Sequence, residues 1–149
     1  MSDKEHIYAA CLSRVEQMIQ TSNNSLQQAE ESAQSETKSS AGDKFETGRA
    51  MMHAEIHKSK RHLAEAKLLL MDLKSIGFKK SYTSVEKGCY VMTNSGNYFI
   101  AVGLGRINVE EINCYAISPA SPMAKVLIGK SVDQQINFNG MQIVIEKIC

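Results

Sequence analysis

The chain has 149 residues, of which 43% are hydrophobic, and this suffices for one ordinary domain or two small ones. The formal net charge is +1, from 17 basic and 16 acidic side chains, so overall charge gives no argument for nucleic acid or a membrane surface as the main partner. No segment resembles a signal peptide or a membrane span, so we expect a cytoplasmic protein without a membrane partner.

The four cysteines lie far apart in the sequence, without the paired spacing of a zinc site or a redox pair. Cys11 falls on an apolar helical stripe, and Cys89 and Cys114 fall within strand-like runs; the fourth is Cys149. In such places a cysteine usually serves as a small buried hydrophobe. We therefore expect structural thiols.

The first half of the chain predicts two long helices. In the first, apolar or small residues recur at steps near three and four, at Tyr8, Cys11, Val15, Met18, Ser22, Ser25 or Leu26, Ala29 and Ala33. In the second, the same steps run through Met52, Ile56, Ser59, Leu63, Ala66, Leu70 and Leu73. Such a narrow stripe is typical of a coiled-coil seam. Lys74 in the last turn and Gly77 just beyond it predict the end of the second helix.

The two stripes match each other across a single turn. Paired positions, such as Val15 with Ala66, have residue numbers of constant sum, as two antiparallel helices in register require. The turning point falls near residues 40 and 41, where serine, alanine and glycine supply the turn. We predict an antiparallel coiled-coil finger over residues 1–77, with its tip near 39–46, folded within one chain and hence monomeric.

Disorder is the alternative interpretation of the polar segments Thr21–Gln28 and Ser32–Ser40. The matched register argues against it, because a disordered segment has no reason to keep the phase of a partner helix.

His53 and His57 stand one helical turn apart, as in a metal-binding pair. The zinc-protease pattern places a glutamate directly after the first histidine, and here that position is Ala54. We therefore interpret both histidines as solvated residues of the helix surface.

Two carboxylates, Asp43 and Glu46, open the second helix at the predicted tip. Acids at these positions are typical of a capping box and suit the positive end of the helix dipole. The same pair could hold Mg²⁺, although weakly, since that ion is usually bound by one or two carboxylates together with other ligands. A metal role would therefore need ligands from another protein.

The second half, residues 78–149, reads as a small α+β module. Strand-like runs occupy 89–93, 98–102, 114–117, 135–138 and 141–148. Ser121 followed by Pro122 predicts the start of a short helix that Gly129 ends, and Asn139-Gly140 predicts a tight hairpin. We expect a mostly antiparallel sheet with one helix. It carries no glycine-rich phosphate loop or nucleophile elbow, so we interpret it as a binding module.

Together the two halves resemble the Gre transcript-cleavage factors of bacterial RNA polymerase. The specific match is Ile117–Lys130, with its Ile-Ser strand end, Ser-Pro helix start and leucine-containing helix closing on Gly-Lys. Tyr98–Gly103 resembles the preceding strand. Gly42-Asp43-x-x-Glu46 matches the Gly-Asp-x-x-Glu of the family and falls at the predicted end of the finger.

The resemblance implies a coiled-coil finger followed by an FKBP-like domain. The domain would dock at the rim of the polymerase secondary channel through Ser121, Pro122 and Met123. The finger would carry Asp43 and Glu46 to the active centre, where they would share a Mg²⁺ ion with the polymerase and promote cleavage of backtracked RNA. The chain would then be no enzyme itself and would have no tightly bound cofactor.

Four bases of the second helix, Lys58, Lys60, Arg61 and Lys67, could guide the nascent RNA 3′ end within that complex. A solvated helix face explains the same residues.

The chain departs from the family after Glu46, where Thr47-Gly48-Arg49-Ala50 replaces the usual asparagine, acid and aromatic residue, and at Ala120, where the family can have an acid. These departures favour an alternative, a channel-binding regulator without cleavage activity. Two further alternatives are a prolyl isomerase, for which the chain lacks a tryptophan to floor an apolar pocket, and a self-associating coiled-coil adaptor.

Overall fold

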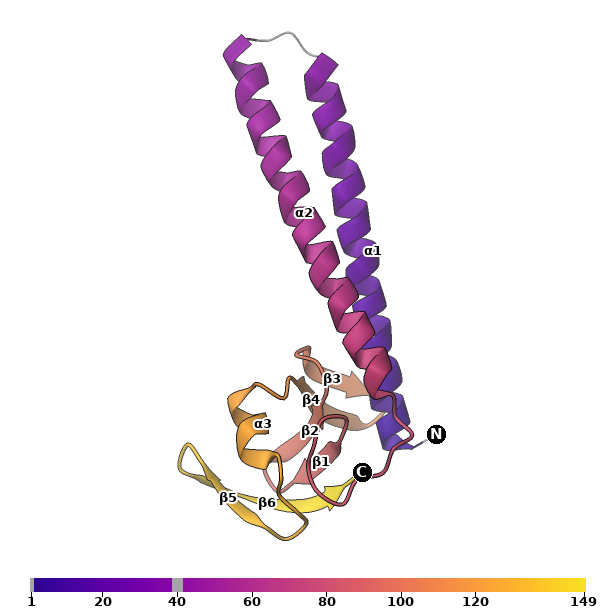
Figure 1. Cartoon of the computed structure of the whole chain (residues 1–149), viewed down its shortest axis with the longest axis vertical. Helices are drawn as coiled ribbons and strands as arrows, with labels where there is room; N and C mark the ends of the chain where they lie inside the picture. The colour runs from indigo at the N-terminus through magenta and orange to yellow at the C-terminus, as the bar shows by residue number, and fades with distance from the viewer. Residues whose placement is uncertain (1, 39–41) are drawn as a thin grey trace. The chain divides into compact units, whose positions relative to one another are not determined.

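The computed structural model of the chain describes residues 2–38 and 42–149, and it leaves the side chains of residues 36–46 undescribed. Two long helices, α1 (Asp3–Lys38) and α2 (Gly42–Ile76), form a helical hairpin (Figure 1). They are followed by β1 (Tyr90–Thr93), β2 (Gly96–Ile100), β3 (Gly105–Val109), β4 (Ile112–Ile117), α3 (Pro122–Leu127), β5 (Gln135–Phe138) and β6 (Met141–Ile148). The predicted α+β class, with a helical hairpin before a sheet and one short helix, is confirmed.

The chain forms two compact units. The hairpin unit is Arg14–Leu70, and the sheet unit joins Met1–Ser13 to Met71–Cys149. The beginning of α1 and the end of α2 therefore belong to the sheet unit. The predicted domain boundary at residue 77 stays a prediction.

The seam of the hairpin unit is made of small side chains. Val15, Ala29, Ser59 and Ala66 are all buried there. Met18, which we expected in the seam, is 37% exposed, and the half-buried residue of that turn is Ile19. The four-residue step from Val15 to Ile19 and the three-residue step to Ser22 keep the stripe facing α2. Short side chains let two helices approach closely but bury little apolar area.

The sheet has six strands in the order β3-β4-β2-β1-β6-β5. All neighbouring pairs are antiparallel except β2 and β4, which run parallel with Tyr98 opposite Tyr115. The predicted Asn139-Gly140 hairpin is confirmed: both residues have positive φ, 51° and 80°, as a tight hairpin turn requires. Strand β3 was not predicted from the sequence; it is an edge strand in which Ile107 alone is fully buried.

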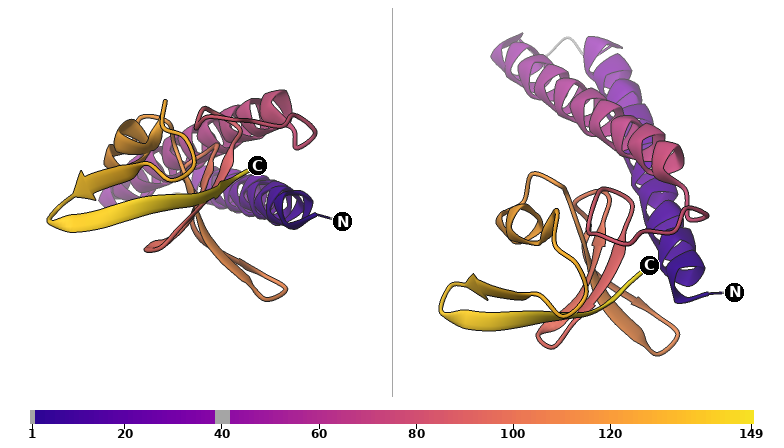
Figure 2. Two further views of the ribbon diagram at one scale, coloured as in Figure 1. Left: turned by 90° about the horizontal axis from the view of Figure 1, so that it is seen from below. Right: turned by 60° about the horizontal axis from the view of Figure 1, so that its bottom comes forward.

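The sheet is covered on both faces. On one face α3 packs over Val91, Ile100, Ile143 and Ile145, through Ala124 and Leu127 (Figure 2). On the other face the register places buried Tyr90, Phe99, Ala116 and Cys114 together. The ends of the helical hairpin supply the buried Ile7 and Leu73 to the same unit, and Tyr8 lies against Phe78 with ring centroids 5.3 Å apart.

In the part of the chain that the structure describes, no helix has the length and apolar character needed to cross a membrane.

Candidate functional site

The predicted tip lies at the start of α2. Helix α1 ends at Lys38 and α2 begins at Gly42, so Asp43 and Glu46 belong to the first turn of α2. Positions three apart in a helix are neighbours on its surface. The side chains of both acids, and residues 39–41, lie outside the described residues, so their predicted capping and metal roles remain predictions.

The start of α3, where polymerase docking was predicted, is a well-built cap. Ser121 has extended backbone angles, and its Oγ accepts a hydrogen bond of 3.2 Å from the backbone N–H of Ala124. Pro122 takes the first helical position, where its missing N–H costs nothing. The preceding turn is closed by Ser118, whose Oγ accepts a hydrogen bond of 3.1 Å from the N–H of Ala120. The cap thus fixes the loop without help from a partner.

This cap divides the three predicted docking residues by role. Pro122 is exposed, whereas Met123 is half-buried and packs against the core under α3. The Ser121 hydroxyl is already engaged in the cap. A partner would therefore meet the ring of Pro122 and the edge of Met123.

An aromatic pair that sequence analysis missed lies on the same face of the sheet as α3. The rings of Tyr98 and Tyr115 are stacked, with centroids 6.1 Å apart and an interplanar angle of 27°. Tyr115 is 45% exposed. The alternation of Asn113, Tyr115 and Ile117 along β4 was the available signal, but it did not say that the face would be open at Tyr115.

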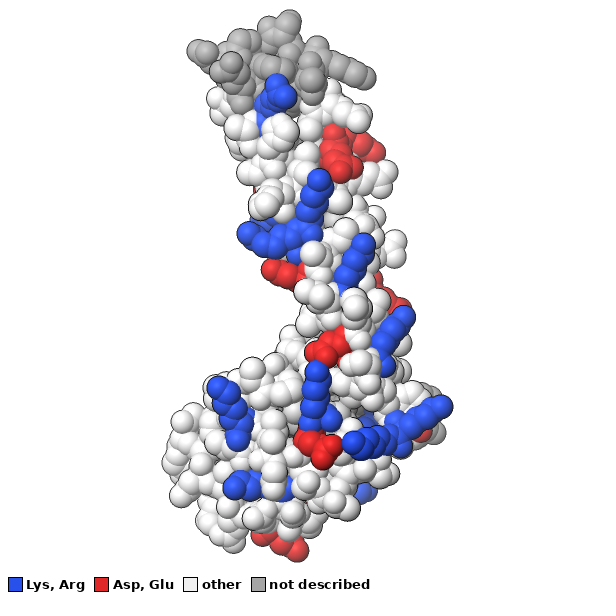
Figure 3. Space-filling model, in the orientation of Figure 1, with Lys and Arg blue, Asp and Glu red and all other residues white. Residues whose placement is uncertain are grey.

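The four predicted RNA-guiding bases lie in the hairpin unit, and all are exposed. A helix turns about 100° per residue, so Lys60 and Lys67 share one side of α2 while Lys58 and Arg61 share another. On the face drawn in Figure 3, acidic side chains are interspersed among the basic ones along the hairpin. The structure therefore brings these bases together in two pairs and forms no single basic surface from them.

As residue types, the histidines of α2 and the buried cysteines are possible metal ligands and nucleophiles. His53 and His57 are exposed, and within the described residues no group of three or more His, Cys, Asp or Glu is placed to hold a metal. Burial raises the pKa of the Cys89 thiol to about 11, and likewise that of Cys114. Thiols with such pKa values stay protonated at neutral pH and are poor nucleophiles, consistent with the structural role that we predicted.

A groove of about 540 Å³ runs between the two helices of the hairpin unit. Arg14, Gln17, Met18, Thr21 and Ser22 line it from α1, and His62, Glu65 and Leu69 line it from α2. It mixes charged, polar and apolar side chains without converging on one chemical group.

No protein-family model matches the chain, and a search of curated proteins gives no match either.

Proposed function

We propose that this chain binds bacterial RNA polymerase, inserts the end of its helical hairpin into the secondary channel and stimulates cleavage of backtracked RNA. The observation that carries the proposal is the position of Gly42-Asp43-x-x-Glu46, which resembles the Gre motif and opens α2 directly after the connection from α1. A motif where the two helices of a hairpin connect would be carried first into a narrow channel.

Asp43 and Glu46 are the residues that would hold the shared metal. Carboxylate oxygens are the ligands that Mg²⁺ prefers, and two of them leave positions for ligands from the polymerase and the RNA. When bound, Mg²⁺ stabilises the negative charge that develops on the phosphate during hydrolysis. This chain contributes the two carboxylates and the hairpin that delivers them, and the polymerase remains the enzyme.

The FKBP-like sheet domain would dock at the channel rim through the capped turn before α3. The rigid Ser121 cap supports this role, because a loop held by its own hydrogen bonds loses little entropy on binding. Lys58, Lys60, Arg61 and Lys67, all exposed on α2, would accompany the RNA 3′ end. The protein would act as a monomer.

The test is a cleavage assay on backtracked elongation complexes in Mg²⁺. We expect the protein to shorten the RNA, and the double variant Asp43→Asn/Glu46→Gln to lose at least roughly 100-fold of that stimulation, since a metal supplies several kcal/mol of charge stabilisation. The matched control is Glu55→Gln/Glu65→Gln, which makes a similar charge change farther along α2. Equal cleavage by the two double variants would overturn the metal role.

A second candidate is a regulator of the same architecture that occupies the channel without promoting cleavage. It is favoured by Thr47-Gly48-Arg49-Ala50, which departs from the Gre pattern directly after Glu46. This candidate predicts polymerase binding without RNA shortening. Failure to bind polymerase in a pull-down would reject both candidates.

A further inference from the structure

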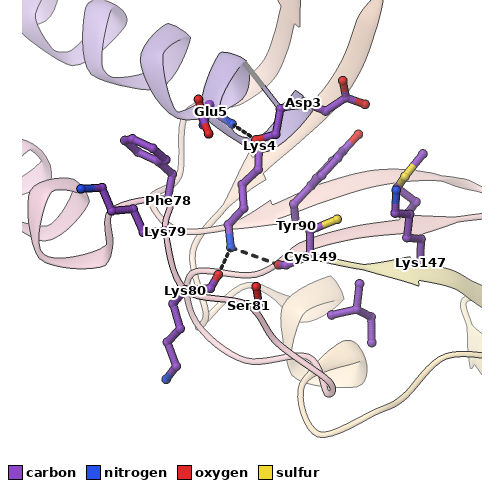
Figure 4. A pocket seen from close by; sticks show the side chains of 13 residues that line it. Asp3, Lys4, Glu5, Phe78, Lys79, Lys80, Ser81, Tyr90, Lys147 and Cys149 are labelled. Carbon is purple, nitrogen blue, oxygen red and sulfur yellow. Dashed lines mark hydrogen bonds between the residues drawn. The ribbon is translucent and has the colours of Figure 1, made fainter.

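Lys4, in the first turn of α1, is a buried lysine of the sheet unit. Its side chain is folded inward, and the residue is only 5% exposed. The Nζ donates hydrogen bonds to two main-chain oxygens, that of Lys80 at 2.8 Å and that of Cys149 at 3.1 Å (Figure 4). The partners lie in the linker that follows α2 and at the end of β6, so one ammonium group joins three segments.

An aromatic ring completes the surroundings of this ammonium. Lys4 Nζ lies 4.5 Å from the centroid of the Tyr82 ring, and Lys80 Nζ lies 5.1 Å from the same centroid. Lys80 Nζ is also 3.3 Å from the Glu86 carboxylate, in an exposed ion pair. Tyr82 is therefore a shared cation–π partner for the first turn of α1 and for the linker.

An open surface pocket of about 730 Å³ lies beside Lys4, and its lining includes Phe78, Tyr90 and Lys147. Segments that border solvent open locally more readily than core segments do, so the hydrogen bonds of Lys4 help to keep them closed. The main-chain oxygen of Cys149 also accepts a hydrogen bond of 3.1 Å from the N–H of Tyr90, so it ties Lys4 to the pairing of β6 with β1.

We propose that Lys4 is a conformational clamp that makes the first turns of α1, the linker over residues 78–84 and the end of β6 open and close as one local unit. The core under α3 is centred on Val91, Ile100, Leu127 and Ile143, on the opposite face of the sheet, and Tyr82 also packs against it. We expect this core to stay closed when the clamp opens. The inference concerns only the sheet unit and is independent of the proposed function.

The test is amide hydrogen exchange of the full chain, measured by mass spectrometry. The variant Lys4→Met keeps the apolar stem and removes the donors. We expect it to speed exchange at least tenfold in peptides covering residues 3–13, 78–84 and 145–149 together, with peptides of α3 and β5 within twofold of the wild type. Lys125→Met, at an exposed lysine of α3, is the control and should change none of the three segments.

Two results would overturn the clamp: unchanged exchange in the three segments, or equal acceleration across the whole sheet unit. If Lys4→Met does not fold, Lys4→Arg and Tyr82→Leu decide the matter. Lys4→Arg keeps a cationic donor, so exchange rates in the three segments should stay within threefold of the wild type. Tyr82→Leu removes the cation–π contacts together with some of the packing of Tyr82 against the core under α3, and it should accelerate the same three segments together, by less than the loss of the donors. Acceleration by Tyr82→Leu in the linker alone would contradict a joint unit.

Discussion

The sheet unit and the hairpin unit are stabilised in different ways. The sheet unit buries large side chains completely, among them Tyr90, Phe99 and Ile100. Among the residues of the hairpin unit whose burial is described, the buried ones are Val15, Ala29, Ser59 and Ala66. Because burial free energy scales with apolar area, the sheet unit holds most of the packing energy. The two units therefore differ in how much stability their own packing supplies.

The largest expected effect comes from removing a large side chain from the sheet. Phe99→Ala should lower the free energy of unfolding by about 3–5 kcal/mol, because it leaves a cavity where Phe99 is fully buried. Val15→Ala, at an equally buried position of the hairpin seam, should cost about 2 kcal/mol. Urea denaturation followed by circular dichroism measures both. Equal losses would remove the distinction between the units.

High pH should weaken the sheet unit specifically. Burial raises the pKa of Cys89 and of Cys114 from 9.0 to about 11, so the unfolded chain releases these protons first and stability falls as pH rises from 9 to 11. Each thiol should cost roughly 2–3 kcal/mol by pH 11. Burial also raises the pKa of Tyr90 to about 12, which adds to the loss.

The lowered pKa of Lys4 acts in the opposite direction, because the unfolded chain then holds more protons than the folded one as pH rises toward the ordinary lysine value. Because the double variant Cys89→Ala/Cys114→Ala lacks the two thiols, its free energy of unfolding should fall more gently from pH 8 to 11 than that of the wild type. A parallel decline in the two proteins would show that these thiols do not set the alkaline slope.

The smallest expected effect belongs to the hairpin seam. Ser59 is 6% exposed, and replacing it with alanine exchanges a hydroxyl for a better helix former of similar size. We expect Ser59→Ala to change the free energy of unfolding by less than about 1 kcal/mol. Thermal denaturation with Ser75→Ala, an exposed serine near the end of α2, provides the comparison. A loss as large as that of Phe99→Ala would mean that the seam depends on the Ser59 hydroxyl.

Features specified by adjacent residues were predictable from the sequence. Asn139-Gly140 formed the expected hairpin, and Ser121-Pro122 formed the expected helix cap, because each depends on the preferences of a few neighbouring residues. The two long helices were predictable from their periodicity. Periodicity did not show how far Met18 would be covered, since a methionine and an adjacent isoleucine satisfy the same pattern and the partner helix decides how deeply each is buried.

Features that depend on distant segments were not predictable. Strand β3 lacks an apolar run because its place at the sheet edge buries only Ile107 fully. The parallel pairing of β2 with β4 follows from the topology and leaves no local mark. No local signal marks Lys4 in the sequence, since its acceptors are 76 and 145 positions away. For Asp43 and Glu46 the sequence motif remains the only evidence of a metal role.

The place of β6 has a consequence for the order of folding. It pairs with β1, about fifty residues earlier in the chain, and it separates β1 from β5. During synthesis the two long helices can pair as soon as both have emerged. One edge of β1 stays open until β6, the last strand of the chain, has been made. An open strand edge is prone to mispairing. Premature termination before Met141 would therefore yield a formed helical hairpin attached to an incomplete, aggregation-prone sheet.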